Sequence, residues 1–332
     1  MPPRVAVFGA AGFTGALTAR LLYTHPSFEL TALTARTEVG RRLDDIYPYH
    51  RVPIALEELD LDRHGDLGAA VVAYPHGASA PLVGQLRERG VRVVDLSADF
   101  RLRDPAVYEL WYRDHAAPEL LAEAVYGLPE RYRETIAAAD LVANPGCYPT
   151  AAVLALAPLA RAGVIKDVVI DAKSGVSGAG RAPSDKTHFV TVDENISAYG
   201  VPRHRHTPEI EQELEALGAS VRVTFTPHLL PLDQGELVSC YVTPEAELGE
   251  DDLDRLYGEA YADEPFVEVV ASPPGVRDVR ETNFCRVSVH RDPRTGRVIV
   301  FATIDNLWKG AASQAVQNLN LMFGLPEGEG IT

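Results

Sequence analysis

The chain has 332 residues, which is more than one hydrophobic core usually supports, so two domains are expected. Its formal net charge of −16 argues against nucleic acid as a partner, and any anionic ligand needs a local concentration of positive charge. No apolar run is long enough to span a membrane, and the first residues lack the apolar region of a secretory signal. Three cysteines, an odd and small number, argue against a disulfide framework and favour a cytoplasmic location.

The first predicted elements are those that open a dinucleotide-binding unit. Residues 4–8 predict a short strand, and residues 16–23 have helical spacing. Glycines in the turn between them let the backbone approach a pyrophosphate, while the helix N-terminus presents its N–H groups. The spacing is G-x-x-G-x-x-G and not the usual G-x-G-x-x-G, so the position at the first strand–helix junction carries the prediction. We assign to cofactor binding Gly9, Ala11, Gly12, Phe13, Thr14 and Gly15.

The second predicted strand, residues 28–33, indicates which dinucleotide binds. Sites selective for NAD usually end this strand with an acid that bonds the ribose 2′-hydroxyl, and no acid stands there. The hydroxyl of Thr34 and the guanidinium of Arg36 suit a 2′-phosphate. NADP(H) is therefore the predicted cofactor. The alternative is that Arg36 is merely a surface residue after a strand.

Strands and helices continue to alternate, with strands at 69–73 and 91–96 and a helix at 80–89. Loops at the carboxyl ends of such strands line the cofactor crevice. By this topology His76 faces the cofactor, although packing within its loop explains this residue equally well. Arg101, in the loop after the later strand, is expected to reach an anionic substrate.

One cysteine is predicted at the start of a helix, directly behind a rigid turn. Residues 141–143 read as the end of a buried strand, residues 150–160 are rich in Ala and Leu with helical spacing, and Pro149 suits a first helical turn. A thiol at a helix N-terminus faces backbone N–H groups and the positive end of the helix dipole, and both favour the thiolate. These residues alone favour a small packing cysteine just as much. Cys240 and Cys285, inside predicted strands, are assigned to packing.

From residue 164 the pattern changes to longer alternating strands, and a glycine-rich loop follows the first of them at 174–180. So many small residues suggest that backbone runs close to a bound molecule, and the flanking Lys173 and Arg181 argue against a merely flexible surface loop. Positive and imidazole side chains gather between residues 173 and 206. We expect an anion-binding cleft, with a solvated basic face as the alternative, formed by Lys173, Arg181, Lys186, His188, Arg203, His204, Arg205 and His206.

Two histidines, His204 and His206, stand just before a predicted helix that starts at Thr207 and runs to residue 217. An unperturbed imidazole titrates near about 6.5, so either ring can serve as acid and base at neutral pH. Glu209 in the first helical turn is placed to orient or charge-balance an imidazole. Two histidines without suitably spaced cysteines or acids make a poor zinc ligand set, so no metal is expected.

The remaining predicted strands are 221–227, 235–243, 283–290 and 298–304, and a last helix ends at Met322. We expect that helix to pack back on the first domain. The fold class is α/β. A Rossmann-type nucleotide-binding domain comprises residues 1–146 with 311–332, and an α+β catalytic and oligomerisation domain with a mixed or antiparallel sheet comprises 147–310.

Four segments together carry a resemblance that covers essentially the whole chain. They are Asn144-Pro145-Gly146-Cys147-Tyr148-Pro149-Thr150, residues 174–180, His204 to Ile210, and Asp305-Asn306-Leu307-Trp308-Lys309-Gly310-Ala311-Ala312. With them the chain resembles the N-acetyl-gamma-glutamyl-phosphate reductases of arginine biosynthesis. It is more distantly similar to the aspartate-semialdehyde dehydrogenases, which share the architecture and the acyl-phosphate chemistry.

The resemblance implies that NADPH reduces N-acetyl-L-glutamyl 5-phosphate to N-acetyl-L-glutamate 5-semialdehyde and phosphate, in an enzyme that forms dimers or tetramers. Cys147 would be the nucleophile that forms a thioester. The acid/base would lie in the histidine pair, with His206 favoured and with His204 and Glu209 in support. Residues expected to border the nicotinamide are Ser174, Gly175, Ser177, Gly178 and Asn306; those expected to hold the substrate are Arg101, Asn144, Lys173, Arg181 and Lys186.

Three alternatives remain open at this level. A related branch reduces the phosphate of a carrier-protein-bound aminoadipate or glutamate, but the glycine loop here favours the free acetylated substrate. An aspartate-semialdehyde dehydrogenase would use the same machinery on another aldehyde. A non-catalytic NADP-binding protein on the same fold would keep the coenzyme turn and have an unreactive thiol at Cys147.

Overall fold

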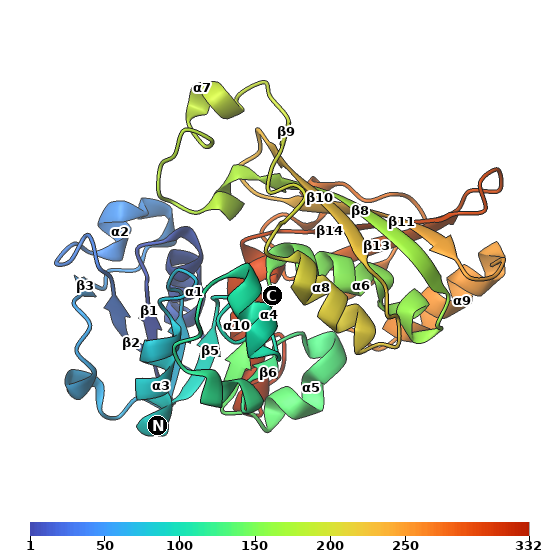
Figure 1. Cartoon of the computed structure of the whole chain (residues 1–332). Coiled ribbons are helices and arrows are strands. Elements are labelled where there is room, and N and C mark those ends of the chain that lie inside the picture. The colour runs from blue at the N-terminus through green and yellow to red at the C-terminus, as the bar shows by residue number, and fades with distance from the viewer. Residues whose placement is uncertain (332) are drawn as a thin grey trace. The chain divides into compact units, whose positions relative to one another are not determined.

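The computed structural model describes residues 1–331 and separates into two units (Figure 1). One unit comprises residues 1–146 together with the segment that begins at Ala311, and the other comprises residues 147–310. Thr332, which ends the first domain expected above, lies outside the described residues. Within residues 1–331, no helix combines the length and the apolar content needed to cross a membrane.

A parallel seven-stranded sheet forms the centre of the first unit, in the order β3-β2-β1-β4-β5-β7-β6. The chain moves outward from β1 to β3 and then returns to place β4 beside β1, so the strand order reverses between β1 and β4. Ligands of such sheets bind at this switch point. The predicted Rossmann-type architecture is confirmed. The strands are β1 (Arg4–Phe8), β2 (Glu29–Thr34), β3 (Leu56–Glu57), β4 (Ala69–Val72), β5 (Arg92–Asp95), β6 (Val125–Tyr126) and β7 (Leu141–Ala143).

The central strands β4 and β7 are buried at every position and carry only Ala, Val and Leu, as strands covered on both faces do. The last helix, α10, is buried at all of its positions and packs against α1, α5 and β5 of the same unit. The α-helices of this unit are α1 (Phe13–Tyr23), α2 (Leu43–Ile46), α3 (Ala80–Glu88), α4 (Pro105–Trp111), α5 (Pro129–Ala137) and α10 (Ser313–Met322); the 3-10 turns are η1 (Pro48–His50), η2 (Leu61–His64) and η3 (Pro118–Ala122).

The second unit also has a seven-stranded sheet, in the order β12-β13-β14-β11-β8-β10-β9. Its neighbours are antiparallel except for β8 with β10 and β12 with β13, so the predicted mixed sheet is confirmed. The strands are β8 (Ile165–Gly175), β9 (Ser197–Ala198), β10 (Val223–Leu230), β11 (Glu236–Pro244), β12 (Val267–Val269), β13 (Cys285–Arg291) and β14 (Val298–Ile304).

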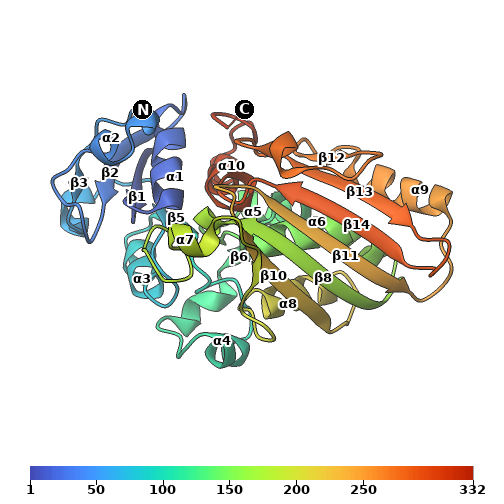
Figure 2. The same cartoon turned by 90° about the horizontal axis from the view of Figure 1, so that it is seen from above.

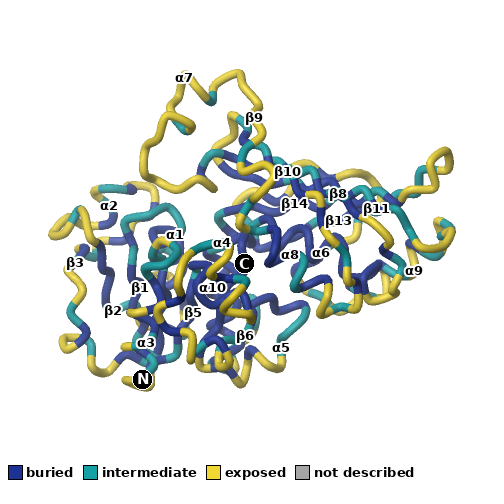
Figure 3. Tube along the Cα trace, viewed as in Figure 1, coloured by how far each residue is buried: buried dark blue, intermediate teal, exposed yellow. Residues whose placement is uncertain are grey.

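Three helices, α6, α8 and α9, lie on one face of this sheet (Figure 2). From Tyr148 to Ala160 every residue of α6 is buried, because the helix is apolar all round and lies among β8, β11, β14 and the other two helices. A long excursion after β8 carries the short α7 and is almost entirely exposed (Figure 3). The helices are α6 (Cys147–Arg161), α7 (Phe189–Val192), α8 (Thr207–Glu215) and α9 (Glu250–Tyr261); the short turns are η4 (Val176–Ala179), η5 (Val276–Val279) and η6 (Trp308–Ala312), the last a π-helical turn.

Candidate active site

Cys147 is the first residue of α6, three residues earlier than the predicted helical run begins. The side chain is partly exposed, whereas Cys240 and Cys285 are buried inside β11 and β13 as expected. A cysteine whose only role was packing would be buried like these two. The start of α6 therefore presents a partly exposed sulfur to the positive end of a fifteen-residue helix, a setting that favours the thiolate.

The turn before α6 is held from inside the first unit. Arg101 is 5% exposed, and its guanidinium donates through Nε to the carbonyl of Asn144 (2.7 Å) and through Nη2 to that of Leu96 (2.8 Å). The Asn144 side chain is buried and accepts a hydrogen bond from Asn318 Nδ2 (3.0 Å). These contacts position Arg101 and Asn144 at the turn before α6, and their predicted role in binding the substrate stays a prediction. The same contacts hold the backbone of Asn144 in place.

His204 is enclosed by aromatic rings. Its ring centroid lies 5.8 Å from that of Tyr148, 5.4 Å from Tyr199 and 5.2 Å from Phe225. Its Nδ1 accepts the backbone N–H of His206 at 3.1 Å, so the ring proton of the neutral form is on Nε2. Burial, with a smaller contribution from the charge of Arg205, lowers the pKa of His204 to about 4. This imidazole is therefore neutral at pH 7.

His206 differs from His204 in its surroundings. It precedes α8 as the N-cap residue, and its ring lies 4.9 Å from that of His204 and 5.9 Å from that of Tyr148. Both histidines are partly exposed, although Nδ1 of His206 is buried, and Glu209 in the first turn of α8 is buried. Because both rings contact the residue that follows Cys147, the structure brings the histidine pair and the thiol into one region of the second unit.

Two hydrogen-bonded tyrosine hydroxyls belong to rings that contact His204, and the sequence did not predict them. Tyr199 donates to the hydroxyl of Tyr148 (3.1 Å), which donates to the carbonyl of His228 (3.5 Å). Burial is the main cause that raises the pKa of Tyr148 and of Tyr199 far above the usual range, so both hydroxyls stay protonated. The only local signal for Tyr148 was its position beside the cysteine.

The predicted glycine loop starts inside β8 and continues as the turn η4. Asn306 links it to β11, because its Nδ2 donates to Ser177 Oγ (3.0 Å) and its Oδ1 accepts the N–H of Gly235 (2.7 Å). A Cβ on Gly175 would lie 2.7 Å from the carbonyl oxygen of Asp233. Close approach to the chain's own backbone therefore explains this glycine. The structure does bring together Ser174, Ser177, Gly178 and Asn306.

The cations expected to bind the substrate lie in different settings. Lys173, in β8, forms an ion pair with Asp171 (Nζ to Oδ2, 2.6 Å), and Asp171 also contacts Nδ1 of His228 (3.2 Å). Arg181 and Lys186 are exposed on the excursion that carries α7 (Figure 3). Lys173 is therefore already partly neutralised, and the positive charge of this segment lies mainly at its surface.

In the first unit, glycines shape the turn between β1 and α1, where the pyrophosphate is predicted to bind. Gly9 has φ +94°, and a Cβ there would lie 2.6 Å from the carbonyl oxygen of Ala73; a Cβ on Gly15 would collide with the Gly9 carbonyl. A Cβ on Gly12, the N-cap of α1, would meet only the Gly9 carbonyl oxygen, at 3.8 Å. Two glycines thus shape the turn, and the third leaves room at the N–H groups that begin the helix.

The end of β2 carries the residues predicted to contact the 2′-phosphate. Arg36 is exposed and its guanidinium carbon lies 5.2 Å from the ring centroid of Tyr74, while Thr34 is buried. His76 accepts the N–H of Ala98 through Nδ1 (2.9 Å) and packs edge-on against Tyr112. Its contacts are those of a loop-packing residue, the alternative left open by the sequence.

The structure also shows an acid, Glu236, that the sequence analysis did not single out. It is fully buried, and the side chain of Cys147 interacts with its carboxyl group. In the sequence, an acid stood at a position of β11 that shares its face with Val238 and Cys240.

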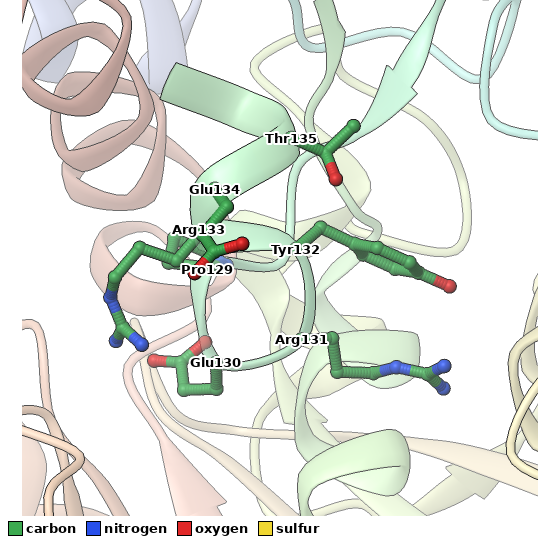
Figure 4. Close-up of a pocket in the computed structure, with 7 residues that line it drawn as sticks. All are labelled: Pro129, Glu130, Arg131, Tyr132, Arg133, Glu134 and Thr135. Carbon is green, nitrogen blue, oxygen red and sulfur yellow. The ribbon is translucent and has the colours of Figure 1, made fainter. Parts of the chain in front are cut away.

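A separate pocket is lined by residues 129–135 of α5 in the first unit (Figure 4), and none of the predicted site residues line it.

Gly310, in η6, packs against the candidate nucleophile, so we expect Gly310→Ala to displace Cys147. A Cβ on Gly310 would lie 2.9 Å from Cβ of Cys147 and 3.3 Å from its Cα. Misplacement of a reacting group by about 1 Å can cost about 100-fold in rate, so kcat is expected to fall by about that factor with NADP affinity preserved. Gly258→Ala in α9 is the matched control, because nothing lies within 4 Å of the added methyl group. An unchanged kcat in Gly310→Ala contradicts the prediction.

Comparisons with known proteins cover both units. Residues 4–139 match the family model described as the semialdehyde dehydrogenase NAD binding domain, and residues 147–306 match the semialdehyde dehydrogenase dimerisation domain. Among solved structures, aspartate semialdehyde dehydrogenase II of Vibrio cholerae, complexed with ASA, superposes with a TM-score of 0.74 at 19% identity over 98% of this chain and 99% of that one. The Candida albicans aspartate semialdehyde dehydrogenase with NADP gives 0.71 at 16% identity, over 97% and 99%. At such identities these structures show the fold alone.

Relatives with higher identity carry another name. N-acetyl-gamma-glutamyl-phosphate reductase of Desulforudis audaxviator is 52% identical over 99% of this chain and 97% of its own length. The protein of that name from Moorella thermoacetica is 49% identical over 98% and 96%. The resemblance seen in the four sequence segments is therefore confirmed. The chain belongs to the semialdehyde dehydrogenase family, in the branch whose members are named N-acetyl-gamma-glutamyl-phosphate reductase.

Proposed function

We propose that this protein is an NADPH-dependent oxidoreductase of arginine biosynthesis, which converts N-acetyl-L-glutamyl 5-phosphate to N-acetyl-L-glutamate 5-semialdehyde and phosphate. One observation carries the proposal: a partly exposed thiol begins α6, and two histidine rings contact the residue that follows it. The relatives at 46–52% identity over nearly the full chain support the choice of substrate.

Cys147 acts as the nucleophile. Its thiolate attacks the acyl carbon, the bond to the phosphate oxygen breaks, and a thioester remains on the enzyme. Bound NADPH supplies the hydride that reduces this thioester. The backbone N–H groups at the start of α6 stabilise the oxyanion that develops.

His206 moves the proton at the substrate oxygen. Its imidazole protonates the oxyanion and takes the proton back when the carbon–sulfur bond breaks and the aldehyde leaves. His204 supports this ring from behind, since its neutral Nδ1 accepts the backbone N–H of His206. The glycine loop with Asn306 remains the predicted border of the nicotinamide. The predicted contacts of the substrate, its phosphate and carboxylate groups included, remain Arg101, Asn144, Lys173, Arg181 and Lys186.

The residues of the first unit fit NADP(H). The turn from Gly9 to Gly15 and the N-terminus of α1 would hold the pyrophosphate, because Gly12 leaves these N–H groups accessible. Thr34 and Arg36 would hold the 2′-phosphate. The exposed guanidinium supplies a charge-assisted hydrogen bond that NAD cannot accept.

We expect Arg36→Ala to weaken NADP binding by about 10-fold to 100-fold and to change NAD binding little, because a hydrogen bond to a charged group contributes about 1.5–3 kcal/mol. Fluorescence titration of both nucleotides measures the two dissociation constants. Arg63→Ala serves as the control, since Arg63 is exposed elsewhere on the same unit. Equal losses for NADP and NAD would refute the 2′-phosphate assignment.

An assay with two aldehydes tests the proposed activity. Purified protein is given NADP and phosphate with either N-acetylglutamate 5-semialdehyde or aspartate semialdehyde, and NADPH formation is followed. Activity with the acetylated aldehyde alone is expected. Preference for aspartate semialdehyde identifies the other branch of the family. Activity only with a carrier-protein-linked substrate identifies the carrier-dependent branch, and NADP binding without turnover indicates a non-catalytic protein.

We infer further that the enzyme is a cytoplasmic homo-oligomer, a dimer or tetramer. The match of residues 147–306 to a dimerisation domain supports this. On the sheet face opposite to α6, Val169, Tyr241 and Ile299 form one lateral row of partly buried apolar side chains. A second copy would remove this row from water.

A further inference from the structure

Three loops that follow neighbouring strands of the first sheet meet at one edge of it. The carboxyl ends of β2, β1 and β4 lie side by side, because β2 and β4 both pair with β1 in parallel. Arg36 follows β2, Gly9 follows β1 and Tyr74 follows β4. This is the edge at which the strand order reverses, where ligands of such sheets bind.

Tyr74 links two parts of the predicted coenzyme site. Its ring is partly buried and packs against the hydrophobic core of the unit. A Cβ on Gly9 would lie 3.0 Å from Cδ1 of Tyr74, so the ring also lies against the coenzyme turn. The guanidinium carbon of Arg36 lies over the same ring, 5.2 Å from its centroid. The core therefore holds a ring that supports an exposed cation.

The surroundings of Arg36 differ from those of the arginines that follow it. Arg41 pairs with Glu38, and Arg42 pairs with Asp44 (Nη2 to Oδ2, 2.6 Å). Within residues 1–331, Arg36 has no such ion pair and lies against an aromatic ring. A carboxylate would fix the guanidinium and also cancel its charge. An aromatic face attracts the cation and leaves both its charge and its N–H donors available.

We propose that Tyr74 is a positioning residue that sets the preference of this site for NADP over NAD. The inference rests on the proposed function, in which Arg36 binds the 2′-phosphate. The ring holds the guanidinium at the end of β2 before the coenzyme binds, so less rotamer freedom is lost when the phosphate arrives. NAD has no 2′-phosphate and gains little from this arrangement.

The contact of the same ring with Gly9 gives Tyr74 a second, purely structural role. Loss of that contact would disturb the turn that NADP and NAD share, so it would weaken both nucleotides equally. Loss of the contact with Arg36 would weaken NADP alone. A comparison of the two nucleotides therefore separates positioning of the guanidinium from packing against the turn.

Tyr74→Leu removes the aromatic face and keeps an apolar side chain on the core. We expect it to weaken NADP binding by about 3-fold to 10-fold, the range of a partly exposed cation–π contact, and NAD binding by less than about twofold. Tyr74→Phe keeps the face and should bind both nucleotides like the wild type. Fluorescence titration of each protein measures the dissociation constants of NADP and NAD.

A double-mutant cycle shows whether the ring acts through Arg36. In Arg36→Ala, which has already lost the guanidinium, adding Tyr74→Leu should change the NADP dissociation constant by less than about twofold. Phe323→Leu is the matched control, since Phe323 is the ring under another guanidinium of the same unit, that of Arg92 (4.7 Å). It should leave the ratio of the two dissociation constants at the wild-type value.

Tyr74→Glu reverses the logic of the ring by placing a carboxylate beside the guanidinium. NADP affinity should fall further than in Tyr74→Leu, by about 10-fold or more, because the carboxylate pairs with Arg36 and repels the 2′-phosphate. NAD affinity should change far less. The ratio of the two dissociation constants should therefore shift towards NAD.

Equal losses for the two nucleotides in Tyr74→Leu, or a selective loss of the same size in Tyr74→Phe, overturn the proposal. An undiminished effect of Tyr74→Leu in the Arg36→Ala background does so too. If Arg36→Ala is itself unselective, the 2′-phosphate assignment fails and the inference with it. If Arg36→Ala is selective and Tyr74→Leu is not, the inference alone fails. None of these titrations requires turnover, so the outcome does not depend on the substrate assignment.

Discussion

Replacing Cys147 with serine is expected to abolish reduction of the acyl phosphate, with a loss of about 1000-fold or more in kcat, while NADP binding stays intact. A serine hydroxyl is not ionised near neutral pH, and the start of α6 lowers the energy of an anion by far less than this would require. Steady-state oxidation of NADPH measures the first effect and nucleotide titration the second. The coenzyme turn belongs to the other unit, so its affinity should not change.

The control for this substitution is Cys240→Ser, which alters a cysteine buried inside β11. It should lower stability, because it places a hydroxyl in a packed core, and keep most of the activity. Mass spectrometry of wild-type protein mixed with substrate should find the acyl group on Cys147. Retained turnover in Cys147→Ser, or an acyl group on another residue, would remove Cys147 as the nucleophile.

The second large effect is expected at the histidine pair. His206→Asn should lower kcat by about 100-fold to 10,000-fold, the usual contribution of a general acid–base group. His204→Asn should cost less than about tenfold, because an asparagine oxygen can replace Nδ1 as acceptor of the His206 N–H. The pH dependence of kcat should lose the limb of the imidazole only in the His206 variant. The reverse ranking would assign the acid/base role to His204.

A stability measurement can further distinguish His204 from His206. The folded-state pKa of His204, about 4, lies below the ordinary value of 6.5, so the unfolded chain takes up a proton that the folded chain does not. The protein therefore loses stability as the pH falls from about 6.5 to about 4. His204→Asn removes this part of the pH dependence, which urea unfolding at several pH values can measure.

The main sheets were predictable because their signals are local. The residues of β1, β7 and β14 were obtained from short apolar or alternating runs, and the glycine turn marked the first junction with a helix. The edge strands β3, β6, β9 and β12 have only two or three residues each, too few for any periodicity. They form because a neighbouring strand offers its hydrogen-bonding edge.

The same distinction between local and distant signals holds for the individual side chains of the site. The position of Cys147 follows from the turn and helix that adjoin it in sequence. The directions of Arg101 and His76 do not, because buried carbonyl and amide groups elsewhere in the fold orient them. Glu236 was not recognised, since its neighbours Cys147 and Asp305 come from distant parts of the chain.

The second unit is an insertion that runs from Cys147 to Gly310, and the packing of Gly310 against Cys147 brings its two ends together. The segment that follows carries α10, which the first unit needs to cover α1 and α5. On the ribosome, the whole insertion is synthesised before α10, so the nascent chain possesses its proposed nucleophile before its coenzyme-binding half can mature. Biogenesis therefore ends with the closure of that half, and a chain stalled before residue 311 would display an acylatable thiol without the means to reduce its adduct.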